Sequence, residues 1–508
     1  MRHKRVVTPS RLKVSIVFLG VAVALLPLAD LSLTGRDPWG ELGRLGLGLI
    51  TPDISAIESI LTALALTLAI AIAGVALGAS VGLVLAPFYH RPIVRLGAIG
   101  VRSIHEIFWA LLLLNVTGLG ATTGILAIAL PYCGIFAKVY AEHLEEADPR
   151  PRQVLDRTVS DLSAFLYARL PLALSPIRIY TLYRLECGIR SSAVLGFVGL
   201  ATLGFQLDTV FKQGQYSAVG AILLIYFVVI GTVRWWMRWH LTPLYILGSL
   251  VCLIALDHPP PGGGSLLTFL THDIVPAPLR SGALGAPETW HALAEWSGRL
   301  FSTQALPGLI DTLIVAQLAL ILTGLVAIMG FPLIVPRVSG RLGAIVGHLG
   351  LVVGRSTPEY MLAYILLQVC GPSMLPAILA LGLHNGAIIA HLLGRQAVAM
   401  DASLRRDAPR GVNLYAYELV PRLYGSFTAL CLYRWEIIMR ESAIIGMLGI
   451  ATLGFYIDSA VSELRLDRVV FFLLVTAAAT LIVDWLSRYL RSRMGLHHLQ
   501  IATSPKAP

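Results

Sequence analysis

Arginine and glutamate recur at fixed spacing inside an otherwise apolar stretch, and the whole pattern occurs twice. The first copy reads YRLECGIRSSAVLGFVGLATLGFQLD from Tyr183 to Asp208, and the second reads YRWEIIMRESAIIGMLGIATLGFYID from Tyr433 to Asp458. In a helix, a glutamate four residues before an arginine favours an ion pair, as at Glu186 and Arg190. At membrane depth such charges either pair within the protein and hold a neighbouring segment, or they mark a pathway. The charged residues of the two copies are Arg184, Glu186, Arg190, Arg434, Glu436 and Arg440.

The two copies are an internal repeat with an offset of 250 residues. They align without a gap over 26 positions, of which 14 are identical. A repeat of this length has to be explained before any fold is argued, and its period is far longer than that of a solenoid unit. The repeat therefore predicts a chain built from two related halves, residues 1–240 and 241–508.

Glycines form the second part of each copy. Small residues let helices approach closely, and glycine also tolerates a break in the backbone. Passive packing explains any single one, but the same three glycines stand in both copies. We therefore expect a gate lined by close helix contacts. The six glycines are Gly196, Gly199, Gly204, Gly446, Gly449 and Gly454.

A shorter echo lies upstream of each copy, as RSIHE at Arg102–Glu106 and RSTPE at Arg355–Glu359. Its arginine and glutamate are four residues apart, so they either neutralise each other or offer a cation to an anion in a pathway. His384 and His391 share one face of a helix, but no His/Cys cluster or CxxC pair accompanies them. We expect no metal site and no cofactor in this chain.

The composition indicates a membrane protein. Of the 508 residues, 56% are hydrophobic and 13% are charged, against about 25% charged in soluble domains. Apolar runs long enough to cross a bilayer recur along the whole chain. We predict an all-α polytopic protein with twelve spans as two parallel six-span repeats. The expected spans are 14–31, 58–85, 96–116, 125–140, 170–207, 218–233, 241–256, 309–335, 342–367, 375–393, 420–457 and 469–486.

The basic residues give an orientation. Arginine and lysine outnumber the acidic residues by 39 − 29 = 10. With the N-terminus inside, every inner loop is rich in them, whereas the outer turns 117–124 and 371–373 contain none. This distribution follows the positive-inside rule, so both termini are expected in the cytoplasm.

Two long polar loops precede the two motif copies on the inner side, at 142–165 and 395–415. Loops of this length in a compact protein are usually functional, although a disordered connection is the alternative. Two related loops imply two copies of a docked partner. The candidate docking residues are Glu142, Glu145, Glu146, Asp148, Arg395, Asp401, Arg405 and Arg406. The motif charges, directly after each loop, are expected to form an ion-pair cluster that ties it to the glycine gate.

No motif for ATP hydrolysis or for covalent catalysis is present. The chain lacks GxxxxGK[ST], a nucleophile elbow and HExxH. The chain is therefore expected to be a transport subunit and not an enzyme, with any ATP hydrolysed by a separate chain.

The pattern LYRxExxxRxSAxxGxxGxxxxGFxxD, preceded by an acidic inner loop, resembles the permease subunits of phosphonate and phosphite ABC importers. The resemblance covers residues 51–238 and 271–491, so two permeases of the type I importer fold would be fused in one chain. Departures from the family pattern are ATLGF at Ala201 and Ala451 in place of AGGIGF, His105 where the second half has Pro358, and a second loop without an acidic run.

The resemblance implies a function and partners. It implies import of phosphonate, phosphite or another phosphate analogue across a bacterial inner membrane. Two ATPase subunits carrying ATP and Mg would bind the inner loops. A periplasmic or lipid-anchored binding protein would deliver the substrate from outside.

Other classes remain open. One is a secondary transporter with parallel repeats, which needs titratable residues near the middle of its spans. Another is an ABC permease for a different small solute. A structural membrane scaffold would not need two matched loops.

Overall fold

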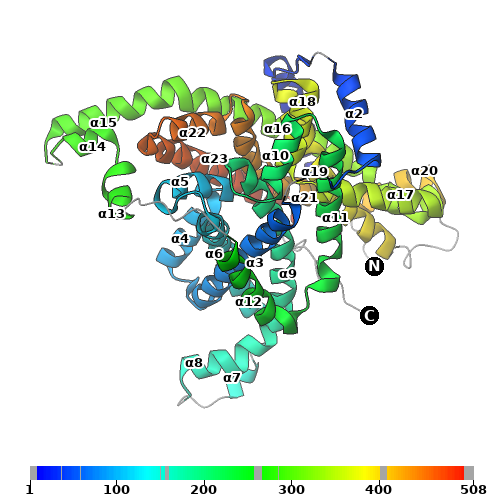
Figure 1. Cartoon of the computed structure of the whole chain (residues 1–508). Helices are drawn as coiled ribbons and strands as arrows, with labels where there is room; N and C mark the ends of the chain where they lie inside the picture. Colours follow the sequence, from blue (N-terminus) through cyan, green and yellow to red (C-terminus); the bar gives the residue numbers. More distant parts are fainter. Residues whose placement is uncertain are drawn as a thin grey trace. The chain divides into compact units, whose positions relative to one another are not determined.

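Figure 1 shows the computed structural model of the chain. It describes residues 9–496 except 36, 56, 58, 149, 155–158, 257–265, 284 and 401–408. Within those residues all regular structure is helical, from α1 (Pro9–Leu25) to α23 (Leu466–Arg493). The expected all-α class is confirmed.

Seven helical segments of the described residues are long and apolar enough to cross a membrane, or up to ten if each of three bent pairs counts as one span. Two shorter apolar helices, Trp239–Ala255 and Glu359–Cys370, accompany them. The chain is thus a multi-pass membrane protein, and the number twelve stays a prediction. The seven segments are Arg11–Leu28, Ile60–Phe88, Ala121–Glu146, Tyr216–Val233, Pro287–Ile334, Met374–Met400 and Leu466–Arg493.

The helices form two compact units that do not coincide with the halves of the sequence. Unit 1 takes residues up to 43 and from 274 onward, and unit 2 takes residues 44–273. The first helix of the chain, α1, packs on α16 (Leu306–Gly330) of the second repeat. The first helix of the second repeat, α12 (Thr242–Ala255), packs instead on α3 (Ile60–Leu85) of the first. Each repeat therefore contributes its opening helix to the other unit, while the repeat boundary at 240/241 stays a prediction.

Unit 2 is built around α3 and α6, and α9 packs on both. A stripe of glycines on α3 lets α6 approach closely, because a Cβ at any of them would press on α6. This contact fixes the face of α6 that carries Tyr132. The other helices of unit 2 are α4 (Pro92–Ser103), α5 (Glu106–Thr117), α6 (Ala121–Glu146), α7 (Arg150–Val154), α8 (Asp161–Ala164), α9 (Leu170–Val194), α10 (Leu203–Lys212), α11 (Tyr216–Trp236) and α13 (Leu266–Thr268).

Unit 1 has the related pair α16 and α19 (Met374–Met400), but here the glycines lie on the later helix. Gly382 faces Leu322, and Gly386 faces Val326. The close approach brings Asn385, between these contacts, into the interior. The other helices are α14 (Ala277–Ser281), α15 (Pro287–Leu300), α17 (Pro336–Ser356), α18 (Glu359–Cys370), α20 (Val412–Leu414), α21 (Val420–Ile445) and α22 (Leu453–Ser462), and α2 (Pro38–Ile50) straddles the boundary between the units.

A helix breaks in both units at the RSxxE echo. Helices α4 and α5 meet at 93°. Between α17 and α18, Pro358 holds Thr357 in an extended conformation, because proline disfavours a helical residue before it. In unit 2 His105 takes the place of proline and caps α5, with its Nδ1 accepting from the amide of Ile107 at 3.3 Å. Two different residues thus produce the same break.

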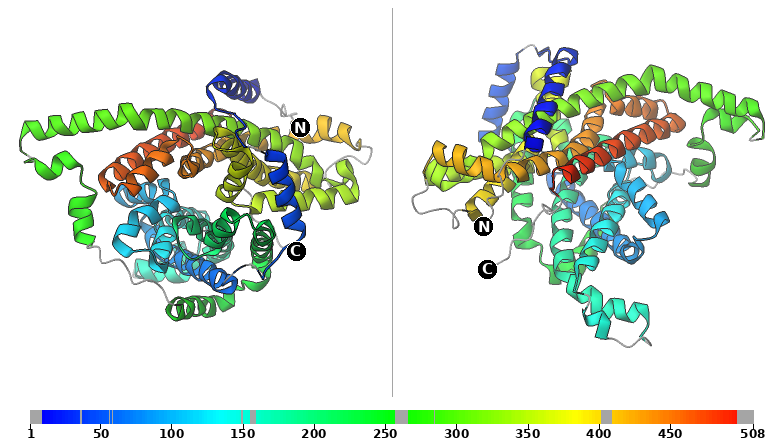
Figure 2. Two further views of the ribbon diagram at one scale, coloured as in Figure 1. Left: turned by 45° about the horizontal axis from the view of Figure 1, so that its top comes forward. Right: turned by 180° about the vertical axis from the view of Figure 1, so that it is seen from behind.

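The motif helices α9 and α21 also begin alike. Each follows a π-helical turn, Phe165–Arg169 before α9 and Tyr415–Leu419 before α21, and these turns are 250 residues apart. Figures 1 and 2 show α7 and α8 extending beyond the other helices of unit 2 at this end of α9. The loop predicted at 142–165 thus contains two short helices, whereas much of its counterpart, 401–408, lies outside the described residues.

Candidate functional site

In unit 2 the first motif arginine lies on an aromatic ring. The guanidinium carbon of Arg184 is 4.1 Å from the centre of the Tyr132 ring, and Tyr132 is buried near the middle of α6. A cation over a buried ring is stabilised by the ring's negative face. Arg190 donates to the sulfur of Cys187 at 3.2 Å. Arg184 therefore lies beside the middle of α6, and the ion-pair cluster expected of the motif charges stays a prediction.

Glu106 lies where α5 begins, next to the helix break. Its carboxylate accepts a hydrogen bond from the Ser191 hydroxyl, and its other oxygen is 3.4 Å from Nε2 of His105. A carboxylate in the first turn also interacts favourably with the helix dipole. Motif helix α9 and the break are thus joined through Ser191 and Glu106.

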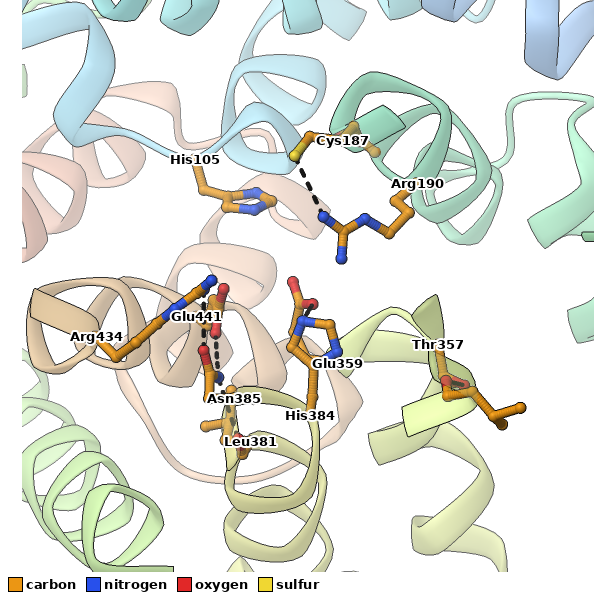
Figure 3. A network of polar contacts seen from close by, with 12 residues as sticks. His105, Cys187, Arg190, Thr357, Glu359, Leu381, His384, Asn385, Arg434 and Glu441 are labelled. Atoms are coloured by element: carbon orange, nitrogen blue, oxygen red, sulfur yellow. Dashed lines mark hydrogen bonds and ion pairs between the residues drawn. The ribbon is translucent and has the colours of Figure 1, made fainter. Parts of the chain in front are cut away.

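In unit 1 the same motif arginine is held by an amide. Arg434 donates to Oδ1 of Asn385 at 3.2 Å, and Nδ2 of Asn385 donates to Oε2 of Glu441 at 3.0 Å. The same nitrogen also reaches the carbonyl of Leu381 at 3.1 Å. Asn385 is fully buried and Glu441 is 7% exposed. Figure 3 shows these side chains as a connected polar network between α19 and α21.

A second contact of unit 1 lies beside this chain. Glu359 begins α18, and its carboxylate is 3.4 Å from Nε2 of His384 on α19. His384 is buried, and its neighbour in sequence is Asn385. The pairing gives His384 a structural partner. Further along α19, His391 packs on the ring of His348 at 5.2 Å.

The two clusters occupy equivalent positions of the repeat. Helices α6 and α19 align at an offset of 253 residues, which sets Tyr132 opposite Asn385 and Pro131 opposite His384. The motif offset of 250 sets Ser191 opposite Glu441. The same helix position thus holds the motif arginine in both units, once with a ring and once with an amide.

The motif glycines form a tight turn within each unit. Gly199 and Gly449 have φ values of 101° and 90°, which side chains rarely adopt. A Cβ at Gly204 would overlap the carbonyl of Ala193, and one at Gly454 would overlap that of Ala443. These local demands explain the glycines without a gate, and the gate itself stays a prediction.

Two threonines secure the helices that follow this turn. Thr67 on α3 accepts from the amide of Leu203 at 2.9 Å, and Thr312 on α16 accepts from the amide of Leu453 at 3.0 Å. Both amides open a helix and have no partner within it. The turn is therefore fixed to the core in both units.

The other predicted residues are placed as follows. Arg102 lies in the last turn of α4, and Arg355 lies in the last turn of α17. Glu186 is on α9, and Glu436 is on α21. Arg440, also on α21, is close enough to Glu441 for their opposite charges to attract. In the first docking loop, Glu142 lies 3.8 Å from Lys138, and Glu146 lies 3.7 Å from His143. Asp148 accepts a hydrogen bond from the amide of Arg150, while Glu145 is exposed. Arg395 is exposed near the end of α19, while Asp401, Arg405 and Arg406 lie outside the described residues.

Sequence reasoning did not identify Tyr132, Ser191, Asn385, Glu441 or the two threonines. A signal for Glu441 was present, since the repeat alignment sets a charged residue against a serine there. Asn385 and Tyr132 gave no such signal, because single polar residues in an apolar helix are common.

Permeases of transport systems for phosphorus compounds are similar to this chain. It is 26% identical over 424 residues to the phosphate-import permease protein PhnE of Mycolicibacterium smegmatis, covering 77% of this chain and 76% of that protein. It is 32% identical over 184 residues to the phosphite transport system permease protein PtxC of Stutzerimonas stutzeri, covering 34% of this chain and 67% of that protein. The putative phosphite permease HtxE of the same organism is 34% identical over 131 residues, or 26% of this chain and 50% of that protein. No family model and no solved structure matches the chain.

Proposed function

Because this chain belongs to the family of phosphonate and phosphite transport permeases, we propose that it forms the membrane pathway of an ATP-driven importer for a phosphorus oxyanion. The chain is a transport subunit. Phosphonate, phosphite and phosphate are the candidate substrates, since the relatives are named for phosphate import and phosphite transport. All three are tetrahedral anions that arginine side chains bind well.

The observation that best supports this function is the partly buried motif arginine of each unit. Arg184 and Arg434 each lie beside the middle of a long apolar helix. Charge is costly there, and it usually marks the path of an ion. Within the described part of the chain, Arg184 lies on one ring and Arg434 donates to one amide oxygen, so each guanidinium has further N–H groups that could bind an anion.

Energy would come from a partner. Two ATPase subunits, carrying ATP and Mg, would bind the loops 142–165 and 395–415 on the cytoplasmic side. Each loop leads through a π-helical turn directly into a motif helix. Movement of a docked ATPase would therefore reach the motif through one continuous element, which is what coupling requires.

The substrate would be delivered by a periplasmic or lipid-anchored binding protein. The permease would lie in the bacterial inner membrane with both termini in the cytoplasm, as the distribution of arginine and lysine favours.

Reconstitution tests the function. The chain would be co-purified with its partner ATPase and binding protein, and placed in liposomes containing ATP. Uptake of labelled phosphite, methylphosphonate and phosphate would be compared with sulfate, which serves as the control anion. ATP-dependent uptake of one phosphorus anion is expected. Uptake that needs no ATPase and follows an ion gradient would instead identify a secondary transporter.

A further inference from the structure

Glu441 is a buried carboxylate, and within the described residues it forms no ion pair. It is 7% exposed, and its hydrogen-bond partner among the described residues is the neutral amide of Asn385 at 3.0 Å. An ionised carboxylate loses its hydration when buried, and a single neutral donor replaces little of it. A bound proton would remove that cost.

Charged groups of both signs lie around Glu441. Glu359 of α18 is close enough for its charge to repel that of Glu441, and Arg434 and Arg440 of α21 attract it. Arg434 also donates from Nη1 to Oδ1 of Asn385, the amide that donates to Glu441. Glu359 in turn has His384 as its partner on α19. Two carboxylates within reach of each other repel when both are ionised, and a proton on the buried one removes that repulsion.

The corresponding position of unit 2 carries no such group. Ser191 stands in place of Glu441 and donates to Glu106. Pro131 stands in place of His384, and Tyr132 in place of Asn385. Unit 1 thus differs from unit 2 at His384, Asn385 and Glu441. His384 contacts the carboxylate of Glu359, Asn385 contacts that of Glu441, and Glu441 is itself the second carboxylate (Figure 3).

We propose that Glu441, with Asn385, Glu359 and His384 around it, is a proton-binding site of unit 1 that has no counterpart in unit 2. The proton remains on the carboxyl group of Glu441, whose second oxygen accepts from Asn385. The site binds a proton whether or not the chain transports a phosphorus anion. It gives the two otherwise related repeats different responses to pH.

Infrared spectroscopy of the purified full chain in lipid nanodiscs tests the site. A protonated carboxylic acid has a carbonyl stretching band separate from that of a carboxylate, and this band should disappear as the pH is raised. At neutral and mildly alkaline pH, where exposed carboxyl groups are ionised, the band is expected to be absent from Glu441→Gln. It should remain in Glu418→Gln, the matched control, because Glu418 is paired with Arg422 at a more exposed position of the same helical segment. A band that survives in Glu441→Gln, or a wild-type protein without a titrating band, would overturn the proposal.

Stability gives a second measurement that does not depend on transport. If the folded protein holds the proton more tightly than the unfolded chain, the stabilisation is present at low pH and lost as the pH rises. The melting temperature of the wild type should therefore fall with rising pH relative to that of Glu441→Gln. Glu441→Ser, which introduces the unit 2 residue, serves as a second neutral variant and should behave like Glu441→Gln. Parallel pH profiles of the wild type and both variants would contradict a proton site at Glu441.

Discussion

Asn385 joins the motif arginine to a buried acid: its amide accepts from Arg434 and donates to Glu441 across 3.0 Å. The contact links α19 to α21, two helices that also pack on α16 in the core of unit 1. One neutral side chain therefore keeps a cation and a carboxyl group apart while satisfying both. In unit 2 the same position carries Tyr132, and the arginine rests on its ring.

Replacing this amide should destabilise unit 1. Asn385→Leu removes the partner of both Arg434 and Glu441 and leaves two buried polar groups unsatisfied, which costs about 1–3 kcal/mol each. The melting temperature of the purified protein in detergent measures the loss. Adding Glu441→Leu should recover part of it, because one of the two groups is then gone. Strictly additive losses in this double-mutant cycle would show that the two side chains do not interact.

The ring under Arg184 should matter more than its hydroxyl. Tyr132→Leu removes the aromatic face and is expected to cost about 2 kcal/mol in this desolvated position, in addition to any lost packing. Tyr132→Phe keeps the face and should cost clearly less. Equal losses of stability in the two variants would mean that Arg184 gains nothing from the ring.

Thr67 and Thr312 should be needed for their oxygens. In Thr67→Val and Thr312→Val the amides of Leu203 and Leu453 lose their acceptors while the side-chain shape is kept, at a cost of about 1–3 kcal/mol each. The matched control is Thr480→Val, since the buried hydroxyl of Thr480 donates only within its own helix, to Thr476. Thermal unfolding of the three variants measures the difference. A control as unstable as the other two would assign the effect to burial of valine and not to the lost acceptors.

Much of the fold can be predicted from the sequence because it depends on local signals. The apolar runs, the turn glycines Gly118 and Gly371 with positive φ, and the proline that ends α17 all act within a few residues. The repeat also showed where the motif helices lie. These features require no knowledge of which helices pack together.

The contacts of the site could not be predicted in the same way. Asn385 meets Glu441 across 56 residues, and Ser191 meets Glu106 across 85. Hydrophobic periodicity predicts which face of a helix is buried but not which helix packs on that face. It therefore gave no sign that α1 packs on a helix of the second repeat, or that α12 packs on a helix of the first. His384 illustrates the limit, since its spacing invited a comparison with His391, whereas its partner is Glu359.

The two docking loops should respond unequally to charge reversal. The first is acidic, with Glu145 exposed and Glu146 at the end of α6, whereas the second begins with the exposed Arg395. Surface charge contacts are worth about 0.2–1 kcal/mol each, so losing one should weaken ATPase binding by a factor of about 1.4 to 5. Glu145→Lys with Glu146→Lys should therefore weaken binding of the partner ATPase at one site, and Arg395→Glu should do so at the other by a different factor. Arg299→Glu, an exposed charge reversal on α15, is the control that should leave binding unchanged.

Coupled ATPase activity, measured at two salt concentrations, separates the outcomes. Losses of activity that differ between the two loops and shrink at high salt support unequal electrostatic contacts. Equal losses from the two loops contradict them.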